Sequence, residues 1–276
     1  MNKSPTVSII LPTYNRITLL KRAVQSIFEQ SFSDYELIII NDASTDGTRI
    51  FLDELAKKDA RTHPVHHERN YYPDISRTLN EGLALARGNY IARLDDDDYW
   101  CDPDKLKKQA AFLGAYSDCV IVGGGTVVID ENDKERFRYL KLENDTAIRA
   151  KALFSNPLTH STVMFRRDAA LDAGGYGDFK NTEDWDLWLR MGMRGKLYNF
   201  QEYFVRYLMA ERSKSFLFKR SQSKEILRII RSHGSEYPNF YTAYAVNYLQ
   251  YCYSFLPFSV RRISHGFFSK LKRKIS

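Results

Sequence analysis

The chain has 276 residues, of which 43% are hydrophobic and 27% charged, and its net charge is +7. This composition is typical of a globular protein and excludes a disordered or fibrous one, and the length suggests about two domains. No stretch approaches the ~18 apolar residues of a transmembrane helix, and three scattered cysteines indicate reduced thiols, as found in the cytoplasm.

The positive charge is concentrated at the C-terminal end. Residues 212–276 contain thirteen Lys or Arg and two acidic residues, whereas residues 1–211 contain 28 basic and 32 acidic residues. The C-terminal basic residues alternate with Phe, Ile and Leu, which favours an anionic membrane surface over nucleic acid as a partner. We therefore expect no nucleic-acid binding.

Buried strands and amphipathic helices alternate along the first half of the chain. Short runs of branched apolar residues predict strands, and apolar residues three and four apart predict helices. The predicted strands are 7–11, 36–40, 64–67, 90–94 and 119–122. The predicted helices are 19–30, 48–58, 75–86 and one capped by Asp102 with Pro103 at its first position. This order predicts an α/β fold with a mostly parallel, Rossmann-like sheet flanked by helices.

The pattern is less regular after Gly123-Gly124-Gly125. We expect antiparallel strands at 126–129 and 136–140, a further strand at 162–165 and a helix at 182–193. We divide the chain into a domain of residues 1–211, with halves at 1–125 and 126–211, and a helical extension at 212–276.

The strongest candidate site is the run Asp95-Asp96-Asp97-Asp98, directly after the strand predicted at 90–94. Ligands of parallel sheets bind at the carboxyl ends of strands. Four adjacent carboxylates require a positive group to offset their repulsion, and hard oxygen ligands suit Mg²⁺ or Mn²⁺. A solvated acidic loop would explain an isolated run, but the position at a strand end favours a site.

A second polar segment, residues 41–47, follows the strand predicted at 36–40. The carboxylate of Asp42 can accept the imide N–H of a uracil or thymine. An Asx turn closed by Asp46-Gly47 explains the same residues equally well.

Glu183, Asp184 and Asp186 lie at the start of the helix predicted at 182–193, where the helix dipole favours acids. The functional alternative is a general base with an aromatic platform for a sugar, although we expect Trp185 and Trp188 to pack in the core.

The histidines carry weaker signals. His63, His66 and His67 have loose metal spacing without a Cys or acid to complete a ligand set, so we place them in a surface loop. His160, before an apolar strand, is interpreted as a hydrogen-bonded residue of the core or its rim.

The motifs together resemble those of the family 2 inverting glycosyltransferases of GT-A fold. The resemblance covers about residues 6–207 and depends on the order and spacing of several motifs. These are VSIILPTYNR from Val7, NDASTDGT from Asn41, GNYIARLDDDD from Gly88, GGY from Gly174 and EDWDLWLR from Glu183.

The resemblance implies metal-dependent transfer of a sugar from a nucleotide diphosphate sugar, UDP-linked, to a glycan or lipid-linked acceptor in surface polysaccharide or glycolipid synthesis. Residues 1–125 would bind the nucleotide and residues 126–211 the acceptor. The donor-binding residues would be Pro12, Tyr14, Asn15, Arg16, Asp42, Arg77, Asp95 and Asp96. Asp97 and Asp98 would hold Mn²⁺ or Mg²⁺, and Asp184 would be the catalytic base, supported by Glu183.

Two other functions remain open at this point. A catalytically silent nucleotide-sugar or glycan-binding protein could have the same fold, although the intact Asp95, Asp97 and Asp184 disfavour it. A nucleotidyltransferase also uses acids and Mg²⁺, but it would need a Gly-rich, basic phosphate loop where this chain has Thr13-Tyr14-Asn15-Arg16.

An aromatic stripe marks the C-terminal extension. Its members recur every three or four residues, as on one face of a helix: Tyr237, Tyr241, Tyr244, Tyr248, Tyr251, Phe255 and Phe258. Packing against the catalytic domain is the favoured interpretation, and the headgroup layer of a bilayer is the alternative. With the basic end at 260–276, residues 237–276 indicate peripheral contact with an anionic membrane, on its cytoplasmic face.

Overall fold

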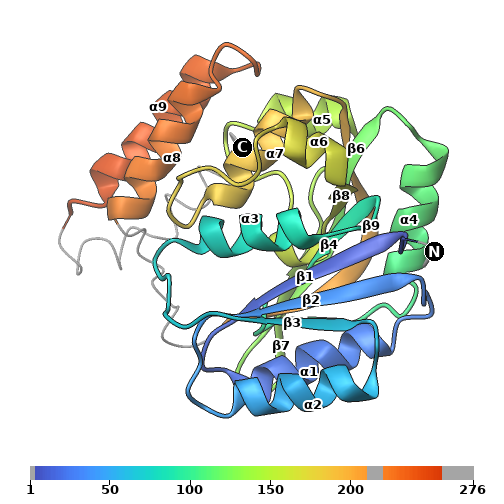
Figure 1. The fold of residues 1–276 in the computed structure, drawn as a ribbon. Helices are drawn as coiled ribbons and strands as arrows, with labels where there is room; N and C mark the ends of the chain where they lie inside the picture. Colours follow the sequence, from blue (N-terminus) through green and yellow to red (C-terminus); the bar gives the residue numbers. More distant parts are fainter. Residues whose placement is uncertain (1–3, 210–219, 257–276) are drawn as a thin grey trace.

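The computed structural model describes residues 4–209 and 220–256 and has one mixed sheet covered by helices on both faces (Figure 1). The strands are β1 (Val7–Thr13), β2 (Tyr35–Asn41), β3 (Thr62–His66), β4 (Tyr90–Arg93), β5 (Tyr99–Trp100), β6 (Cys119–Ile129), β7 (Glu135–Tyr139), β8 (Met164–Arg166) and β9 (Lys196–Leu208). The helices are α1 (Ile17–Phe28), α2 (Thr48–Lys58), α3 (Ile75–Leu85), α4 (Lys105–Ala115), α5 (Asp145–Lys151), α6 (Arg167–Asp172), α7 (Glu183–Gly192), α8 (Arg220–Ser232) and α9 (Phe240–Tyr253).

The strand order is β3-β2-β1-β4-β8-β6-β9-β5, with β7 on β6. Strands β3, β2, β1 and β4 are mutually parallel, as the alternation of strands and helices predicts. Strand β8 then pairs antiparallel with both β4 and β6 and joins the two parts of the sheet.

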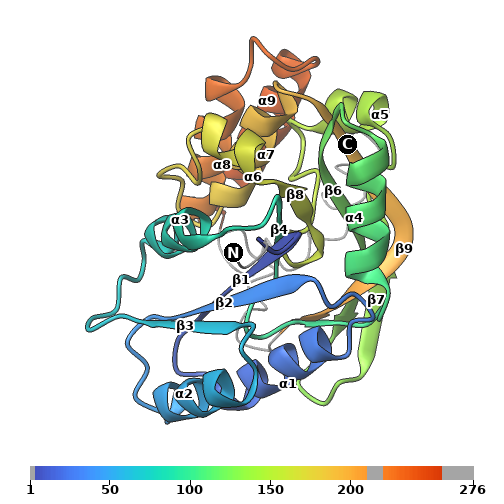
Figure 2. The same ribbon diagram turned by 45° about the vertical axis from the view of Figure 1, so that its right-hand side comes forward.

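Side chains alternate between the two faces of the sheet along each strand, and this divides the hydrophobic core into two clusters, one on each face. On β1, Ile9 and Leu11 pack in a cluster with α1, α2 and α4, whereas Ile10 packs in a second cluster with α3, α6 and α7. Successive side chains of a strand point to opposite faces, so a fully apolar strand requires helices on both sides. Figure 2 shows α1 and α2 on one side of the sheet and α3, α6 and α7 on the other.

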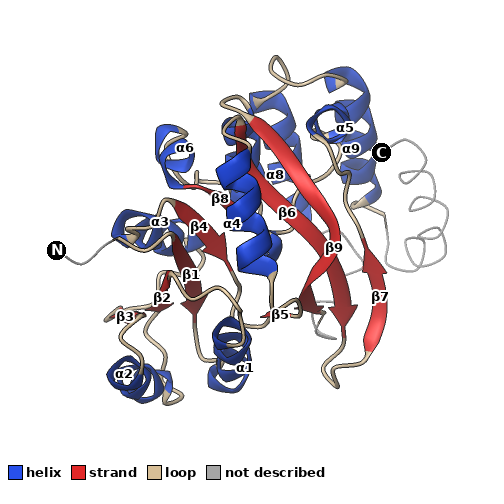
Figure 3. Ribbon diagram, turned by 90° about the vertical axis from the view of Figure 1, so that its right-hand side faces the viewer, coloured by secondary structure: helices blue, strands red, loops and turns tan. Residues whose placement is uncertain are grey.

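The sequence prediction of separate strands at 119–122 and 126–129 is wrong, because β6 runs through all three glycines. A Cβ at Gly123 would collide with the side chain of Asn199, and one at Gly124 with Phe204. Both neighbours belong to β9, which runs beside β6 (Figure 3). The glycines therefore allow close packing of two strands, and the proposed boundary after residue 125 lies inside β6.

Two element starts also differ from the prediction. Helix α4 begins at Lys105, and Asp102 instead accepts the Asp104 N–H at 2.8 Å in the preceding turn. The segment predicted as a strand at 162–165 begins as a short 3-10 helix, His160–Thr162, and only Met164–Arg166 pairs in the sheet.

Helices α8 and α9 pack beside α7 (Figure 1). Ile226, Ile229 and Ile230 of α8 form a third apolar cluster with Trp185 and Leu189 of α7. The C-terminal extension is thus helical, as predicted, in the part that the structure describes. The proposed boundary after residue 211 and the basic end at 260–276 lie outside the described residues.

The expected core packing of the aromatic stripe is correct for Tyr237 and in part for Tyr244, which packs against the third cluster, and wrong for the exposed Tyr241, Tyr248 and Phe255, whereas Phe258 lies outside the described residues. Tyr237 is buried, but Tyr241 is 85% exposed and Tyr248 46% exposed. The buried face of α9 carries Ala243 and Asn247 instead. The helix begins only at Phe240, after the turn that contains Tyr237, so the stripe is not one continuous helix face. Among the described helices, none is both long and apolar enough to span a bilayer.

Candidate active site

A cleft of about 580 Å³ opens at the carboxyl ends of β1, β2 and β4. Most of its lining residues carry a polar or charged group, because these strand ends leave the apolar core. The lining consists of Pro12, Thr13, Tyr14, Arg16, Asp42, Asn70, Tyr72, Ile75, Thr78, Asp95, Asp96, Asp97 and Tyr207. Seven of the residues that the sequence predicts at the donor or metal therefore meet in one cleft, although they come from three separate segments of the chain, residues 12–16, residue 42 and residues 95–97.

Asn15 supports the cleft from outside its lining. Its side-chain oxygen accepts the Thr45 N–H at 2.7 Å, and its own N–H donates to Ser44 Oγ at 2.9 Å. These two bonds connect the loop after β1 to the loop after β2, so Asn15 shapes the wall without lining it.

The segment after β2 forms a turn, as one interpretation of its sequence expects, without using the side chain of Asp42. Asn41 Oδ1 accepts the Ser44 N–H at 3.0 Å, and Asp46 accepts from the Thr48 hydroxyl at 2.6 Å, so these two residues build the turn. Asp42 is left to face the cleft. The turn and the candidate ligand-binding residue are therefore compatible.

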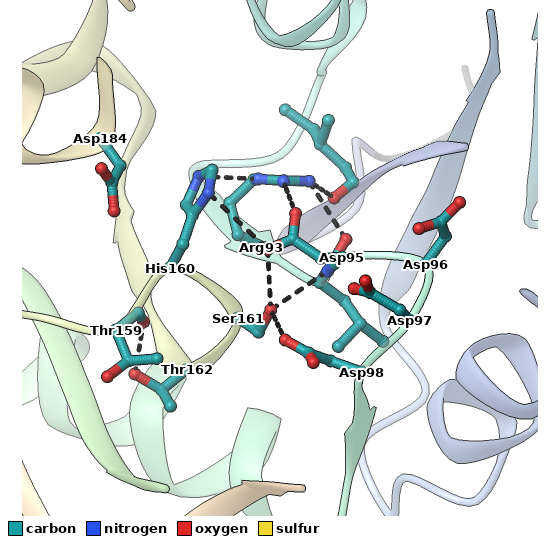
Figure 4. Close-up of polar contacts among 12 residues, drawn as sticks. Arg93, Asp95, Asp96, Asp97, Asp98, Thr159, His160, Ser161, Thr162 and Asp184 are labelled. Carbon is teal, nitrogen blue, oxygen red and sulfur yellow. Dashed lines mark hydrogen bonds and ion pairs between the residues drawn. The ribbon is translucent and has the colours of Figure 1, made fainter. Parts of the chain in front are cut away.

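The four acids of the run have three different sets of partners (Figure 4). Asp95 pairs with the buried Arg93 at 2.7 Å. Arg16 Nη1 lies 3.0 Å from Asp96 and 2.7 Å from Asp97. Asp98 points away from the cleft, where it contacts Ser161 Oγ at 2.5 Å and accepts the Leu208 N–H at 3.1 Å. Asp98 therefore anchors the loop to β9 and the 160–162 helix and does not line the cleft.

Negative charge in this run is only partly compensated. Burial, followed by repulsion from Asp95 and Asp96, raises the pKa of Asp97 to about 6. Burial and repulsion from Asp97 and Asp95 also raise the pKa of Asp98. Asp95 is the exception: although burial opposes it, the charge of Arg93 holds the pKa of Asp95 below its usual value.

A divalent cation fits this arrangement. In the described part of the chain, no three His, Cys, Asp or Glu side chains form a ready ligand set. However, Mg²⁺ usually binds through one or two carboxylates together with substrate phosphates. Asp97 has a raised pKa and faces the cleft, so this carboxylate and a bound diphosphate could hold such an ion together.

His160 separates the acidic run from Asp184 (Figure 4). Its Nε2 accepts from Arg93 Nε at 3.0 Å and lies 3.0 Å from the Tyr176 hydroxyl. Burial, followed by the charge of Arg93, lowers the pKa of His160 to about 3, so the imidazole is neutral. The interpretation of His160 as a hydrogen-bonded residue of the core or its rim is confirmed, since its side chain is 14% exposed and hydrogen-bonded.

Glu183, which is buried, and Asp184, which is half-buried, open α7. Burial raises the pKa of Asp184, against the effect of a hydrogen bond from Asn156. Burial, followed by repulsion from Asp184, raises the pKa of Glu183 to about 8. Asp95 adds repulsion to both groups, so the acids on α7 and those after β4 belong to one electrostatic site. The neighbouring Trp185 and Trp188 are buried, as expected.

Asn156 and Lys141 hold Asp184, and sequence reasoning did not identify either of them. Asn156 Nδ2 donates to Asp184 Oδ2 at 2.7 Å, and Lys141 Nζ donates to the Asn156 carbonyl at 2.5 Å. The Asn156 amide has a defined orientation because its Oδ1 accepts the Leu158 N–H at 3.3 Å. Neither residue belongs to a motif, so no local signal pointed to them.

Arg77 lies outside the cleft. Its guanidinium stacks 3.9 Å from the centre of the Tyr71 ring and lines a neighbouring cavity of about 530 Å³. That cavity is bounded by the start of α3 and the segment before α7, including Tyr176 and Lys180.

The expected surface loop for the three histidines is wrong. His63 and His66 belong to the edge strand β3, and His67 follows it with a side chain only 6% exposed. His67 and Asn70 follow the end of β3. The same rule that identified Asp42 and Asp95, that polar residues after strand ends are candidates for a site, applies to them.

The chain is similar to known glycosyltransferases in sequence. The family model described as "Glycosyl transferase family 2" matches residues 8–173. The chain is 39% identical over 209 residues to a Bacillus subtilis (strain 168) protein that bears the glycosyltransferase name EpsE, covering 73% of this chain and 72% of that protein. It is 30% identical over 189 residues to the amylovoran biosynthesis glycosyltransferase AmsE of Erwinia amylovora, covering 67% and 68%.

Its fold is similar to that of two solved proteins. The mannosyltransferase PcManGT from Pyrobaculum calidifontis, in complex with GDP-Man and Mn²⁺, matches with a TM-score of 0.67 and 17% identity, covering 92% of this chain and 72% of that one. S. aureus TarS 1–349, in complex with UDP-GlcNAc, matches with a TM-score of 0.66 and 18% identity, covering 91% and 73%.

Proposed function

Because the chain belongs to glycosyl transferase family 2 and has the GT-A fold, we propose that it is a metal-dependent, inverting enzyme that uses a nucleotide diphosphate sugar. The observation that carries the proposal is the arrangement of one cleft. Asp42 lies at one strand end of this cleft, the acidic run at another, and Asp184 lies beyond His160 (Figure 4).

The cleft supports a UDP-linked donor. Asp42 is an acceptor that can bind the imide N–H of uracil, with Pro12 and Tyr14 lining the adjacent wall. Arg16, Asp95 and Asp96 lie nearer the phosphate and ribose positions in this assignment. TarS is solved with UDP-GlcNAc, and PcManGT with GDP-Man, so the fold accepts either base, and the choice of UDP depends on Asp42.

Asp97 is the proposed metal-binding carboxylate, and Mn²⁺ or Mg²⁺ the proposed ion. When bound, the ion would neutralise the charge that grows on the departing diphosphate. Arg16 pairs with Asp97 at 2.7 Å. Once the ion binds Asp97 in place of Arg16, the Arg16 guanidinium would be free to contact the diphosphate. Asp98 anchors the loop of the acidic run through its bonds to Ser161 and Leu208, on the side away from the cleft.

Asp184 is the proposed general base. An acceptor hydroxyl that attacks the anomeric carbon opposite the leaving diphosphate must lose a proton, and one such displacement inverts the anomeric centre. Burial raises the pKa of Asp184, which makes the carboxylate a stronger base. Glu183, with a pKa of about 8, is largely protonated at neutral pH and leaves the negative charge on Asp184.

The proposed acceptor is a glycan or a lipid-linked glycan of a surface polysaccharide or glycolipid. The support is the similarity to AmsE, an amylovoran biosynthesis glycosyltransferase. We place the enzyme at the cytoplasmic face of a membrane, in peripheral contact. Four rings on α9 and after it, Tyr244, Tyr248, Tyr251 and Phe255, form an aromatic ladder, with successive ring centres 5.0–6.3 Å apart. Arg220 lies over Phe255, so aromatic and basic groups occur together there.

Thermal shift with a panel of nucleotide sugars, with and without Mn²⁺, tests the proposal. We expect UDP and at least one UDP-sugar to raise the unfolding temperature, and Mn²⁺ to increase the shift. Transfer to a glycan acceptor with inversion, read by NMR of the product, tests the reaction. Binding without turnover on any acceptor would instead favour the silent binding protein.

A further inference from the structure

The His67 side chain lies behind the base end of the cleft, between two carboxylates. Its Nδ1 is 2.7 Å from Asp42 Oδ1, and its Nε2 is 2.6 Å from Glu81 Oε2 on α3. The imidazole is 6% exposed and does not line the cleft, whereas Asp42 does. His67 therefore cannot touch a ligand in the cleft except through Asp42.

The two oxygens of Asp42 have different partners. The Tyr71 N–H lies 3.1 Å from both, but only Oδ1 also contacts His67. Because Oδ1 receives two donors and Oδ2 shares one, Oδ2 has the larger remaining capacity to accept a hydrogen bond. The imidazole and the Tyr71 amide thus fix the carboxylate from one side and leave Oδ2 for a ligand.

The imidazole must be protonated to satisfy both carboxylates, because a neutral ring has only one N–H. Burial opposes the charge, but the hydrogen bonds to Asp42 and Glu81 outweigh it and raise the pKa of His67. The other group against the ring is Tyr71, edge-on at 4.8 Å. Two guanidinium groups lie beyond it, those of Arg69 and Arg77, at 5.4 and 3.9 Å from the Tyr71 ring centre.

We propose that His67 is a positioning residue that holds Asp42 as an ionised acceptor and thereby selects donor bases with a ring N–H at the pairing edge, such as uracil, against cytosine. The inference depends on the proposed contact between Asp42 and the base. An ionised carboxylate only accepts hydrogen bonds, so it matches the N3–H of uracil and repels the N3 lone pair of cytosine.

Loss of the His67 proton should weaken this selection. A single remaining N–H must then serve either Asp42 or Glu81, so Asp42 is held for only part of the time. We therefore expect the affinity for UDP to fall as the pH rises through the pKa of His67. The Glu81→Gln variant lacks the competing carboxylate, so this fall should be smaller in that variant.

The test compares UDP and CDP binding to the wild type, His67→Asn and His67→Gln by calorimetry with saturating Mg²⁺, from about pH 6 to pH 8.5. An Asn amide can replace the Nδ1 donor, and a Gln amide reaches only the Nε2 side. We expect His67→Asn to keep the preference for UDP without the alkaline fall. His67→Gln should lose about ten- to hundredfold of the UDP affinity, as expected for a lost hydrogen bond to a charged group, and little of the CDP affinity.

The Asp42→Ala variant separates this inference from the proposed function. If Asp42→Ala abolishes the preference for UDP but His67→Gln retains it, the role of His67 is overturned and the base contact stands. If neither variant changes the preference, the base contact itself is wrong. Equal loss of UDP and CDP affinity in both His67 variants would show a purely structural role and would also overturn the inference.

Discussion

At the residue scale, the site depends on where each carboxylate of the acidic run points. Asp97 faces the cleft with a pKa raised to about 6, whereas Asp98, the next residue, is directed at Ser161 and β9. Consecutive residues of a tight loop point in different directions, so adjacent acids acquire different tasks. We infer that the first of these two acids meets the metal and the second stabilises the loop.

Replacing Asp97 with Ala should abolish the enhancement of UDP binding by Mn²⁺ while the fold survives, because the residue is on a loop and its side chain pairs with the half-exposed Arg16. Calorimetry of UDP binding with and without Mn²⁺ measures the effect. Asp118→Ala, at an exposed aspartate before β6, is the matched control. Metal-enhanced affinity that persists in Asp97→Ala would refute the metal assignment.

Replacing Asp184 with Asn should leave donor binding near the wild-type value and lower turnover by about 10²–10⁴, the usual contribution of a general base. The Asn side chain has the same shape, so packing at the start of α7 is retained. Steady-state kinetics together with UDP calorimetry separates the two effects. Turnover that stays within a few-fold of wild type would transfer the role to Glu183 or Asp186.

Replacing Asn156 with Ala should shift the acid limb of the rate profile to higher pH. The Asn156 amide stabilises the charged form of Asp184 and thus lowers its pKa, so its removal raises that pKa. A base must be ionised to act, and activity should therefore fall most at low pH. The profile of kcat/KM against pH tests this. A uniform decrease with an unmoved limb would mean that Asn156 contributes only to packing.

At the element scale, helix starts and strand ends bring the functional groups together. Helix α7 places Glu183 and Asp184 in its first turn, and the segment between α5 and β8 supplies Asn156 and His160. Beyond α7, helix α8 is attached through Ile226, Ile229 and Ile230. The aromatic ladder runs along α9: Tyr244 packs against the third cluster, and Arg231 and Arg220 of α8 lie over the rings of Tyr244 and Phe255.

Removing residues 260–276 should leave an enzyme that folds and binds UDP but no longer sediments with anionic vesicles. This segment contains six basic residues and no acidic one, and each base near an anionic surface contributes about 1 kcal/mol. Co-sedimentation at low and high salt measures the binding. Binding that is insensitive to both truncation and salt would assign the contact to the aromatic ladder, and no binding by the intact chain would exclude the membrane as a partner.

At the scale of the whole molecule, a buried ion pair joins the C-terminal helices to the catalytic domain. His233, after α8, contacts Asp186 of α7 at 2.9 Å and Glu236 at 2.7 Å. Burial opposes the charge, but these two hydrogen bonds raise the pKa of His233. Asp186 also binds Arg190, so the pair belongs to a network around the helix that carries the proposed base.

This pair should make stability depend on pH. Because the pKa of His233 is raised by folding, its contribution is complete below the ordinary histidine pKa of about 6.5 and is lost as the pH rises through the folded value. We expect His233→Gln to lower the free energy of unfolding by about 1–3 kcal/mol at acidic pH and by less at alkaline pH. Urea unfolding across this range measures the difference. The raised pKa of His67 is present in the wild type and in His233→Gln alike, so its contribution cancels in the comparison. A stability difference that does not change with pH would contradict the prediction.

By itself, the sequence determined the fold class, the family, and the strand ends where the site forms. Hydrophobic periodicity is a property of short segments, which is why β1, β2, α2 and α3 could be predicted, and the order of the motifs along the chain is visible without any structure. Only the tertiary structure decided the direction of each side chain and the partners brought from distant segments. Asp42 faces the cleft while Asn41 builds the turn, and His67, Lys141 and Asn156 acquire their places through contacts between segments that no local pattern records.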